Sequence, residues 1–287
     1  MYSCDPRAMC IVVTDVTLRK SIFAPDAVYG LAVLDGKLYV LRHRDDNQLY
    51  VYETETKDYE ALYAITIPGL QKKSYNDLTE CDKEQCLFVS DFLAKCIHKV
   101  VPNGEQSKVS KFIDVPYEPK GLSITPDGNL LVTCNPDKLV EYNVTHGEKM
   151  SEVRLHMDIY YPLHAVKRRD GQYVVSHMDG RLSRVVRVGA DGKYRHCFGG
   201  EKGNGNNQLN YPCHLALRED KHTYMYVIVA DNDNHRLMLL DKSMEFVRMM
   251  VENFREPHRI WYDSQAHRLY VGECMGSGRV SVYNVTG

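Results

Sequence analysis

The sequence predicts an all-β protein, a six-bladed β-propeller with four antiparallel strands in each blade. Three observations lead to this prediction. One pattern recurs six times along the 287 residues, apolar and polar residues alternate with period two inside each repeat, and no amphipathic helix of three or more turns is visible. The six repeats cover residues 28–40, 74–89, 118–132, 161–175, 211–229 and 256–271.

Each repeat opens with a proline or aromatic residue, followed by a small or polar residue and then an alternating apolar stretch. We call the aligned small or polar residues the ring residues, and they are Gly30, Asp77, Gly121, His164, His214 and Arg259. Their successive spacings are 47, 44, 43, 50 and 45 residues. A repeat of this length that contains only strand patterns is typical of a propeller blade.

Each repeat contains patterns for four consecutive strands, which would form one blade. Turns such as Asp35-Gly36, Asp127-Gly128 and Asp170-Gly171 lie between the first two apolar runs, and Asp-Gly favours tight hairpins because both residues tolerate a positive φ. Residues 48–53 and 236–241 are typical third strands, and residues 107–113 and 245–251 typical fourth strands. The six blades are therefore expected to start near residues 28, 75, 119, 162, 212 and 257.

The last blade lacks a strand, because only 28 residues follow Arg259. Residues 10–23 form a spare strand-like stretch before the first repeat. We expect this N-terminal region (1–23) to supply the outer strand of the last blade, which would close the ring and remove an exposed sheet edge. Residues 1–287 are then one propeller domain.

Composition and local patterns argue against several classes of ligand. The net charge is −2, from 36 basic and 38 acidic residues, which does not suit a dedicated nucleic-acid binder. The longest apolar run, residues 224–230, is far too short to span a membrane as a helix. The glycine-rich stretch 199–207 lacks the Gly-Lys-Ser/Thr ending and a following helix, so no dinucleotide site is expected.

The sequence contains nine cysteines, an odd number, and none of them forms a Cys-x-x-Cys pair. We interpret them as buried thiols in a reducing compartment and predict a cytoplasmic protein, whereas three or four bridges would indicate an extracellular one. Cys81 and Cys86 flank a four-residue turn and are the pair predicted to form an intramolecular disulfide.

The segment ADNDNHRLMLLD (230–241), preceded by a glycine-rich lead and Pro212, resembles the NHL repeat, which carries Pro-x-x-[Ile/Leu/Val]-Ala and then Val-Ala-Asp-x-x-Asn-x-Arg. The resemblance is strongest in the fifth blade. It implies a six-bladed propeller of the kind found at the C-terminus of tripartite-motif ubiquitin ligases, where such domains bind protein or RNA. This chain shows no RING, B-box or coiled-coil pattern.

In a propeller, the loops entering the inner strands and those joining the second and third strands share one face, which we call the top face. The ring residues surround the channel mouth on that face. We predict non-enzymatic recognition of a protein partner here, without a cofactor, and with binding that strengthens between about pH 7.5 and 6 as histidines gain charge. The predicted binding residues are His164, His177, His214, His258, Arg259, Asp77, Arg42, Arg44, Phe92 and Met178.

Two alternatives remain open for the same face. The first is RNA binding, through Arg42, Arg44, Arg181, Arg236, Arg259 and Arg279. The second follows from a more distant resemblance to the peptidyl-hydroxyglycine amidating lyase, a zinc enzyme of the same propeller type. That resemblance implies a channel metal on His164, His214 and His258, with Arg259 as the partner residue. Binding of a small molecule in the channel is a further open alternative.

Overall fold

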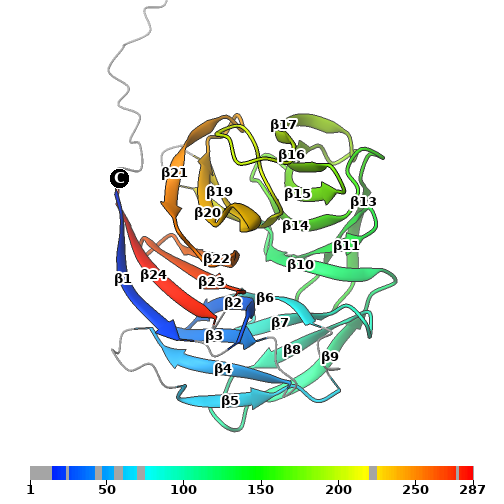
Figure 1. Ribbon diagram of the computed structural model, residues 1–287. Helices are drawn as coiled ribbons and strands as arrows, with labels where there is room; N and C mark the ends of the chain where they lie inside the picture. The colour runs from blue at the N-terminus through cyan, green and yellow to red at the C-terminus, as the bar shows by residue number, and fades with distance from the viewer. Residues whose placement is uncertain are drawn as a thin grey trace, which may run out of the picture.

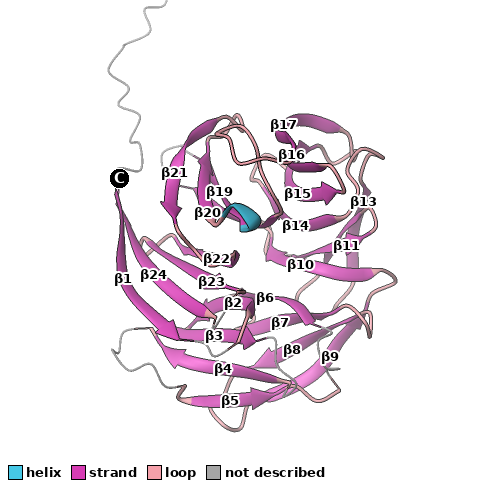
Figure 2. Cartoon of the chain, viewed as in Figure 1, coloured by secondary structure: helices cyan, strands magenta, loops and turns pink. Residues whose placement is uncertain are grey.

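The computed structural model describes residues 15–23, 26–42, 47–54, 61–69, 75–219, 225–275 and 278–286. They form six four-stranded antiparallel sheets around a central axis, as predicted (Figure 1). In this part of the chain the helical structure is a single 3-10 turn, Asn232–Asn234 (Figure 2). None of these residues belongs to a helix long and apolar enough to cross a membrane.

The first three blades are consecutive in sequence, and each runs from its inner to its outer strand. Blade one contains β2 (Val28–Leu34), β3 (Lys37–Arg42), β4 (Gln48–Glu53) and β5 (Tyr63–Thr66). Blade two contains β6 (Tyr75–Cys81), β7 (Cys86–Asp91), β8 (Cys96–Val101) and β9 (Lys108–Asp114). Blade three contains β10 (Glu118–Ile124), β11 (Leu130–Asn135), β12 (Lys138–Tyr142) and β13 (Lys149–Arg154).

The last three blades complete the ring in the same order. Blade four contains β14 (Pro162–Lys167), β15 (Tyr173–Asp179), β16 (Leu182–Val188) and β17 (Tyr194–Glu201). Blade five contains β18 (Pro212–Glu219), β19 (Met225–Asp231), β20 (Arg236–Leu240) and β21 (Phe246–Glu252). Blade six contains β22 (Pro257–Asp263), β23 (Arg268–Glu273) and β24 (Arg279–Thr286), with β1 (Asp15–Phe23) as its outer strand.

Every inner strand begins with an irregularity in its register at the ring residue. Such a bulge bends a strand and re-aims a side chain, so all six blades present their ring residues at the start of the channel. Two ring residues must be glycine because the next inner strand is so close. A Cβ on Gly30 would lie 2.6 Å from Cβ of Leu78, and one on Gly121 would lie 2.7 Å from Cδ2 of His164.

The hydrophobic core is divided into six clusters of described residues, one at each interface between neighbouring blades. Between blades one and two, for example, Leu41 and Leu49 pack with Leu78 and Val89. The sixth cluster joins blades six and one and includes Ile22 of β1, which is only 1% exposed. Both faces of the inner strands are therefore buried, because each sheet packs between two neighbouring blades.

The ring closes through β1, which pairs antiparallel with β24 from Asp15↔Thr286 to Phe23↔Arg279. The first and last described strands lie side by side in Figure 1, in blue and red. This confirms closure by the N-terminal strand. Residues 10–14 of the expected strand lie outside the described residues.

All seven cysteines in the described residues are free thiols, in agreement with the expectation that most would be free. The predicted Cys81–Cys86 disulfide is wrong. The two residues are opposite each other in the β6–β7 hairpin, but both are buried thiols that pack in the core between blades two and three. Cys4 and Cys10 lie outside the described residues.

Deleting residues 1–23 should destabilise the ring, because it exposes the edge of β24 and removes Ile22 from the core. We expect a melting temperature at least about 5 °C lower, or insoluble protein, at roughly 2–4 °C per kcal/mol for a domain of this size. Deleting only residues 1–14 keeps β1 and is the matched control. Equal melting temperatures for the two truncated proteins would contradict the proposed role of β1.

Candidate functional site

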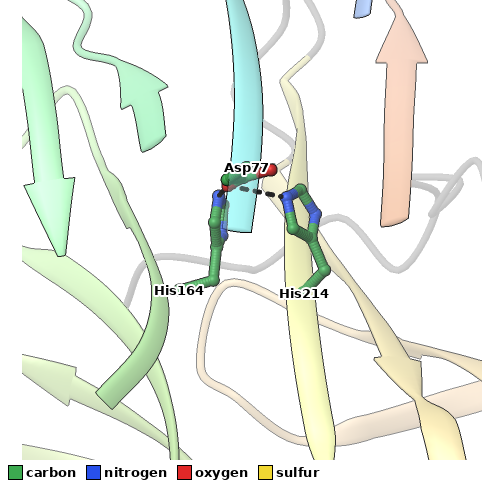
Figure 3. A group of neighbouring side chains, drawn as sticks. All are labelled: Asp77, His164 and His214. Atoms are coloured by element: carbon green, nitrogen blue, oxygen red, sulfur yellow. Dashed lines mark ion pairs between the residues drawn. The ribbon is translucent and has the colours of Figure 1, made fainter. Parts of the chain in front are cut away.

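The ring residues of blades two, four, five and six meet in a buried polar cluster centred on Asp77. Figure 3 shows three of them, Asp77, His164 and His214. One carboxylate oxygen, Oδ1, accepts from the Arg259 Nε at 3.0 Å and from the backbone N–H of the following residue, Leu78, at 2.9 Å. The other, Oδ2, accepts from the backbone N–H of Leu122 at 2.8 Å. Asp77 thus connects three blades, because Arg259 reaches it from blade six across the channel.

His164 and His214 complete this cluster. Their rings stack with centroids 3.7 Å apart, and their Nε2 atoms lie 3.7 and 3.5 Å from Oδ2 of Asp77. The Nε2 of His164 is also 3.1 Å from the carbonyl oxygen of Leu122, so the geometry assigns the ring proton to Nε2. The Nδ1 atoms of both rings are buried and have no hydrogen-bond partner.

Burial and the positive guanidinium control ionisation in this cluster. Burial by itself would raise the pKa of Asp77, but Arg259 and the two imidazoles hold it below its ordinary value, so Asp77 is a carboxylate at neutral pH. Burial lowers the pKa of His164 to about 3 and also lowers the pKa of His214, in both cases against the pull of Asp77. The cluster is therefore one ion pair, Asp77 and Arg259, supported by two neutral imidazoles.

His258 contacts this cluster through Arg259, whose Nη1 donates to the carbonyl oxygen of His258 at 2.9 Å and lies 3.2 Å from its Nδ1. The Nδ1 of His258 is 3.1 Å from the carbonyl oxygen of Val28, and its ring packs on Tyr29 at 4.7 Å. Burial places the pKa of His258 well below its ordinary value. His177, on β15, is fully buried without a partner for either ring nitrogen, and burial followed by the charge of Arg184 lowers its pKa to about 4.

These pKa values correct the expected pH dependence. Burial lowers the pKa of all four imidazoles, so between pH 7.5 and 6 they gain less charge than exposed histidines would, which removes the basis for stronger binding of an acidic partner over that range. The predicted pH dependence used the pKa of an exposed histidine. The fold buries these side chains near the axis of the ring, and burial lowers their pKa values.

The predicted binding residues are also not an exposed surface. His164, His214 and Arg259 are 2, 8 and 7% exposed, because they close the channel mouth around Asp77 instead of facing outward. Arg42 is buried with its guanidinium 4.1 Å from the ring centroid of Tyr50. The remaining predicted residues fall into two groups: Phe92 and Met178 are half-buried, and Arg44 lies outside the described residues.

A metal site would use a different set of ligands from the predicted one. Donor atoms of Asp77, His164 and His214 lie within 4.8 Å of one another, so Asp77 takes the place expected for His258. The arrangement does not fit a catalytic zinc centre, whose three ligands aim their lone pairs at one point. Stacked imidazoles direct their in-plane lone pairs side by side, and both Asp77 oxygens already accept hydrogen bonds.

A second group of possible metal ligands, which the sequence analysis missed, lies on the top side of blade two. Buried donor atoms of Asp91, Cys96 and His98 are within 4.8 Å of one another. Oδ1 of Asp91 accepts from the backbone N–H of Ala94 at 2.9 Å, so this carboxylate caps the β7–β8 turn. Two features could have revealed this group. Asp91 and Cys96 are opposite each other in the β7–β8 hairpin, and Cys96 and His98 are two residues apart, on the same face of β8.

Beyond the ring residues the channel widens into a cavity of about 210 Å³ that is lined by all six inner strands. Its walls include Glu80, Trp261 and Tyr262, which the sequence analysis did not assign to a site. Trp261 packs edge-on against Tyr270 at 5.5 Å, is half-buried, and also lines the cavity.

Fold and site together define a closed six-bladed propeller with a plugged channel mouth. No protein-family model and no curated protein matches the chain, so the NHL resemblance stays a prediction.

Many solved structures do share the fold. Virginiamycin B lyase from Staphylococcus aureus, as a catalytically inactive histidine variant with quinupristin, has a TM-score of 0.62 at 11% identity, over 94% of this chain and 99% of that one. The propeller domain of Cps50 (Swd1) from Myceliophteria thermophila has a TM-score of 0.60 at 13% identity, over 90% of this chain and 84% of that one. A protein of unknown function from Bacteroides caccae has a TM-score of 0.59 at 18% identity, over 88 and 81% of the two chains. At these identities the likeness shows the fold alone.

Breaking the cross-channel ion pair should be costly. Asp77→Asn leaves the Arg259 guanidinium buried without its counter-ion, so we expect a loss of about 3 kcal/mol or more in the free energy of unfolding. Urea denaturation of Asp77→Asn, Arg259→Met and the double variant measures the coupling, expected at roughly 1–3 kcal/mol. Additive effects of the two substitutions would show that the contact does not stabilise the ring.

Buried neutral His177 should make the protein acid-sensitive. Its pKa is lowered in the folded state, so below about pH 6.5 the unfolded chain binds a proton that the folded protein does not, until the pH reaches about 4. We expect His177→Leu to reduce the loss of stability between pH 6.5 and 5, by up to about 2 kcal/mol. Melting curves across this range test it, with exposed His146→Leu as the control. If His177→Leu lost stability between pH 6.5 and 5 as steeply as the unaltered protein does, His177 would not be the buried neutral group responsible.

Proposed function

We propose that the protein is a recognition module that binds a protein partner through its top face. The observation that carries this proposal is a cluster of exposed apolar side chains on one top loop, residues 155–161, which leads from β13 into β14 and which we call the rim loop. Met157, Tyr160 and Tyr161 are 84, 52 and 42% exposed.

The rim loop is held rigidly although its tip is exposed. Leu155 and Ile159 are buried in the core between blades three and four. The guanidinium of Arg184 donates to the carbonyl oxygen of Asp158 at 2.7 Å, and the N–H of Ile159 donates to the carbonyl oxygen of His156 at 2.8 Å. A preorganised loop loses little conformational entropy when a partner binds, which favours affinity.

The exposed residue types suit a protein partner. Tyrosine is enriched among the residues that dominate interface energies, and methionine adapts its shape to an apolar partner. The rings of Tyr160 and Tyr161 are 5.7 Å apart, so together they offer one aromatic surface. Two further top loops add Leu93 and Met275, at 54 and 56% exposure. The rim loop is thus the strongest candidate for the centre of an interface.

RNA binding is the weaker hypothesis for this face, because three of the proposed arginines already have acidic partners. Arg236 donates to Asp231 at 2.7 Å, Arg259 pairs with Asp77, and the Nε of Arg279 lies 3.1 Å from Glu273. Phosphate binding would have to break these contacts. We also place the protein in a reducing compartment such as the cytoplasm, since free thiols persist there.

Replacing the two tyrosines of the rim loop should abolish partner binding. A photo-crosslinking amino acid at position 157 would first identify the bound protein from a cell extract by mass spectrometry. Against that purified partner, Tyr160→Ala with Tyr161→Ala is expected to weaken binding by about 30-fold or more, since interface hot spots contribute at least about 2 kcal/mol. Tyr194→Ala is the matched control, because Tyr194 is 48% exposed but lies at the start of the outer strand β17.

Two outcomes would overturn this proposal. Equal binding by the double variant and by Tyr194→Ala would place the interface elsewhere on the propeller. Crosslinks that disappear after ribonuclease treatment would favour the RNA hypothesis.

A further inference from the structure

The cavity inside the channel has the features of a ligand site and is separate from the rim loop. His164 and His214 are among its lining residues, and all six inner strands contribute to a wall that is about half polar and half apolar. Its volume is about 210 Å³. An apolar cavity of roughly 150 Å³ accepts benzene, so this one has room for an aromatic ring with a short substituent.

Glu80 is the ionisable group on this wall that lacks a charged partner. Its Oε2 atom is buried and has no hydrogen-bond partner, whereas the carboxyl group accepts from the indole N–H of Trp261. These two side chains come from blades two and six, the same blades that Asp77 and Arg259 connect at the channel mouth. A buried carboxyl oxygen without a donor is an unusual feature of a folded protein and calls for a physical explanation.

The other titratable side chains that line the cavity carry no unpaired charge. The Lys167 ammonium lies 3.0 Å from Glu141 and 3.1 Å from Asp127, so its charge is balanced on the wall side. His164 and His214 are neutral, and Asp77 behind them is paired with Arg259. A cation that entered the cavity would therefore meet one available anionic group, Glu80.

We propose that this cavity binds a small organic amine, with its ammonium group on Oε2 of Glu80 and its hydrocarbon body against Trp261, Tyr262 and the leucines of the wall. A primary ammonium supplies the donor that Oε2 lacks and a charge-assisted hydrogen bond. The aromatic side chains add favourable cation–π and apolar contacts.

Ligands of other charge fit this wall less well. A carboxylate or phosphate would place a second negative charge beside Glu80. A neutral alcohol would satisfy the hydrogen bond but would leave the carboxyl group without a counter-charge. Burial raises the pKa of Glu80 to about 7 in the empty site, against the effect of the Trp261 hydrogen bond, so amine binding should release a proton near neutral pH.

The single tryptophan of the chain provides a site-specific signal, because Trp261 lines the cavity and contacts Glu80. Titrating the whole protein with benzylamine at pH 8 should change its tryptophan emission in a saturable way. Benzyl alcohol and phenylacetate have nearly the same shape and should bind at least tenfold more weakly. Amine affinity should rise several-fold from pH 6 to pH 8 as Glu80 ionises, while benzylamine itself stays protonated.

Glu80→Gln tests the charge with little change in shape and should weaken benzylamine binding at least tenfold. The control is Glu245→Gln, since the Glu245 side chain is 69% exposed and lies on the outer side of blade five. The proposal is overturned if emission does not respond to benzylamine at about 10 mM, a range that detects even millimolar affinity. It is also overturned if the three ligands bind equally or if Glu80→Gln binds benzylamine as well as the unaltered protein does. Should that variant not fold, the three-ligand comparison on the unaltered protein decides.

Discussion

Pairing of β1 with β24 is the contact on which the rest of the structure depends. Each blade buries its two faces against its neighbours, so an open row of six would leave one face of blade one and one of blade six exposed to water. The N-terminal strand joins the last blade and brings Ile22 into the core between these two blades. Closure therefore supplies the sixth apolar interface and also removes a free sheet edge.

A closed ring in turn brings together residues that are far apart in sequence. Asp77 and Arg259 are 182 positions apart, and their contact joins blades two and six, which pack on either side of blade one. The same two blades meet again below, where Trp261 donates to Glu80. The axis thus has a closed polar mouth and, beyond it, a cavity that is lined by all six inner strands.

This division separates the surfaces available for function. The mouth is filled by an ion pair and neutral imidazoles, which suits a structural plug better than an exposed binding surface. Under the proposed function, a protein partner contacts the loops around the mouth, among them the rim loop with its three exposed apolar side chains, whereas a small molecule would contact the cavity. Similarity to solved propellers of very different kinds agrees with a scaffold whose specificity lies in such local residues.

The sequence by itself determined the fold, the blade boundaries and the strand that closes the ring. Period-two alternation and Asp-Gly turns are local signals, and a spacing near 45 residues repeats them often enough to count the blades. The ring residues were also identified correctly as a set, because they align in every repeat. What the sequence could not supply was the direction and surroundings of each side chain.

Only the tertiary structure decided that Asp77 is the centre of the cluster, that His258 lies between Val28 and Arg259, and that the histidines are buried with lowered pKa values. It also decided that Cys81 and Cys86 remain thiols and that Glu80 faces a cavity. The physical reason is that burial, ion pairing and pKa depend on groups brought together from different blades. No single repeat contains that information, because the contacts form only when the six blades close around one axis.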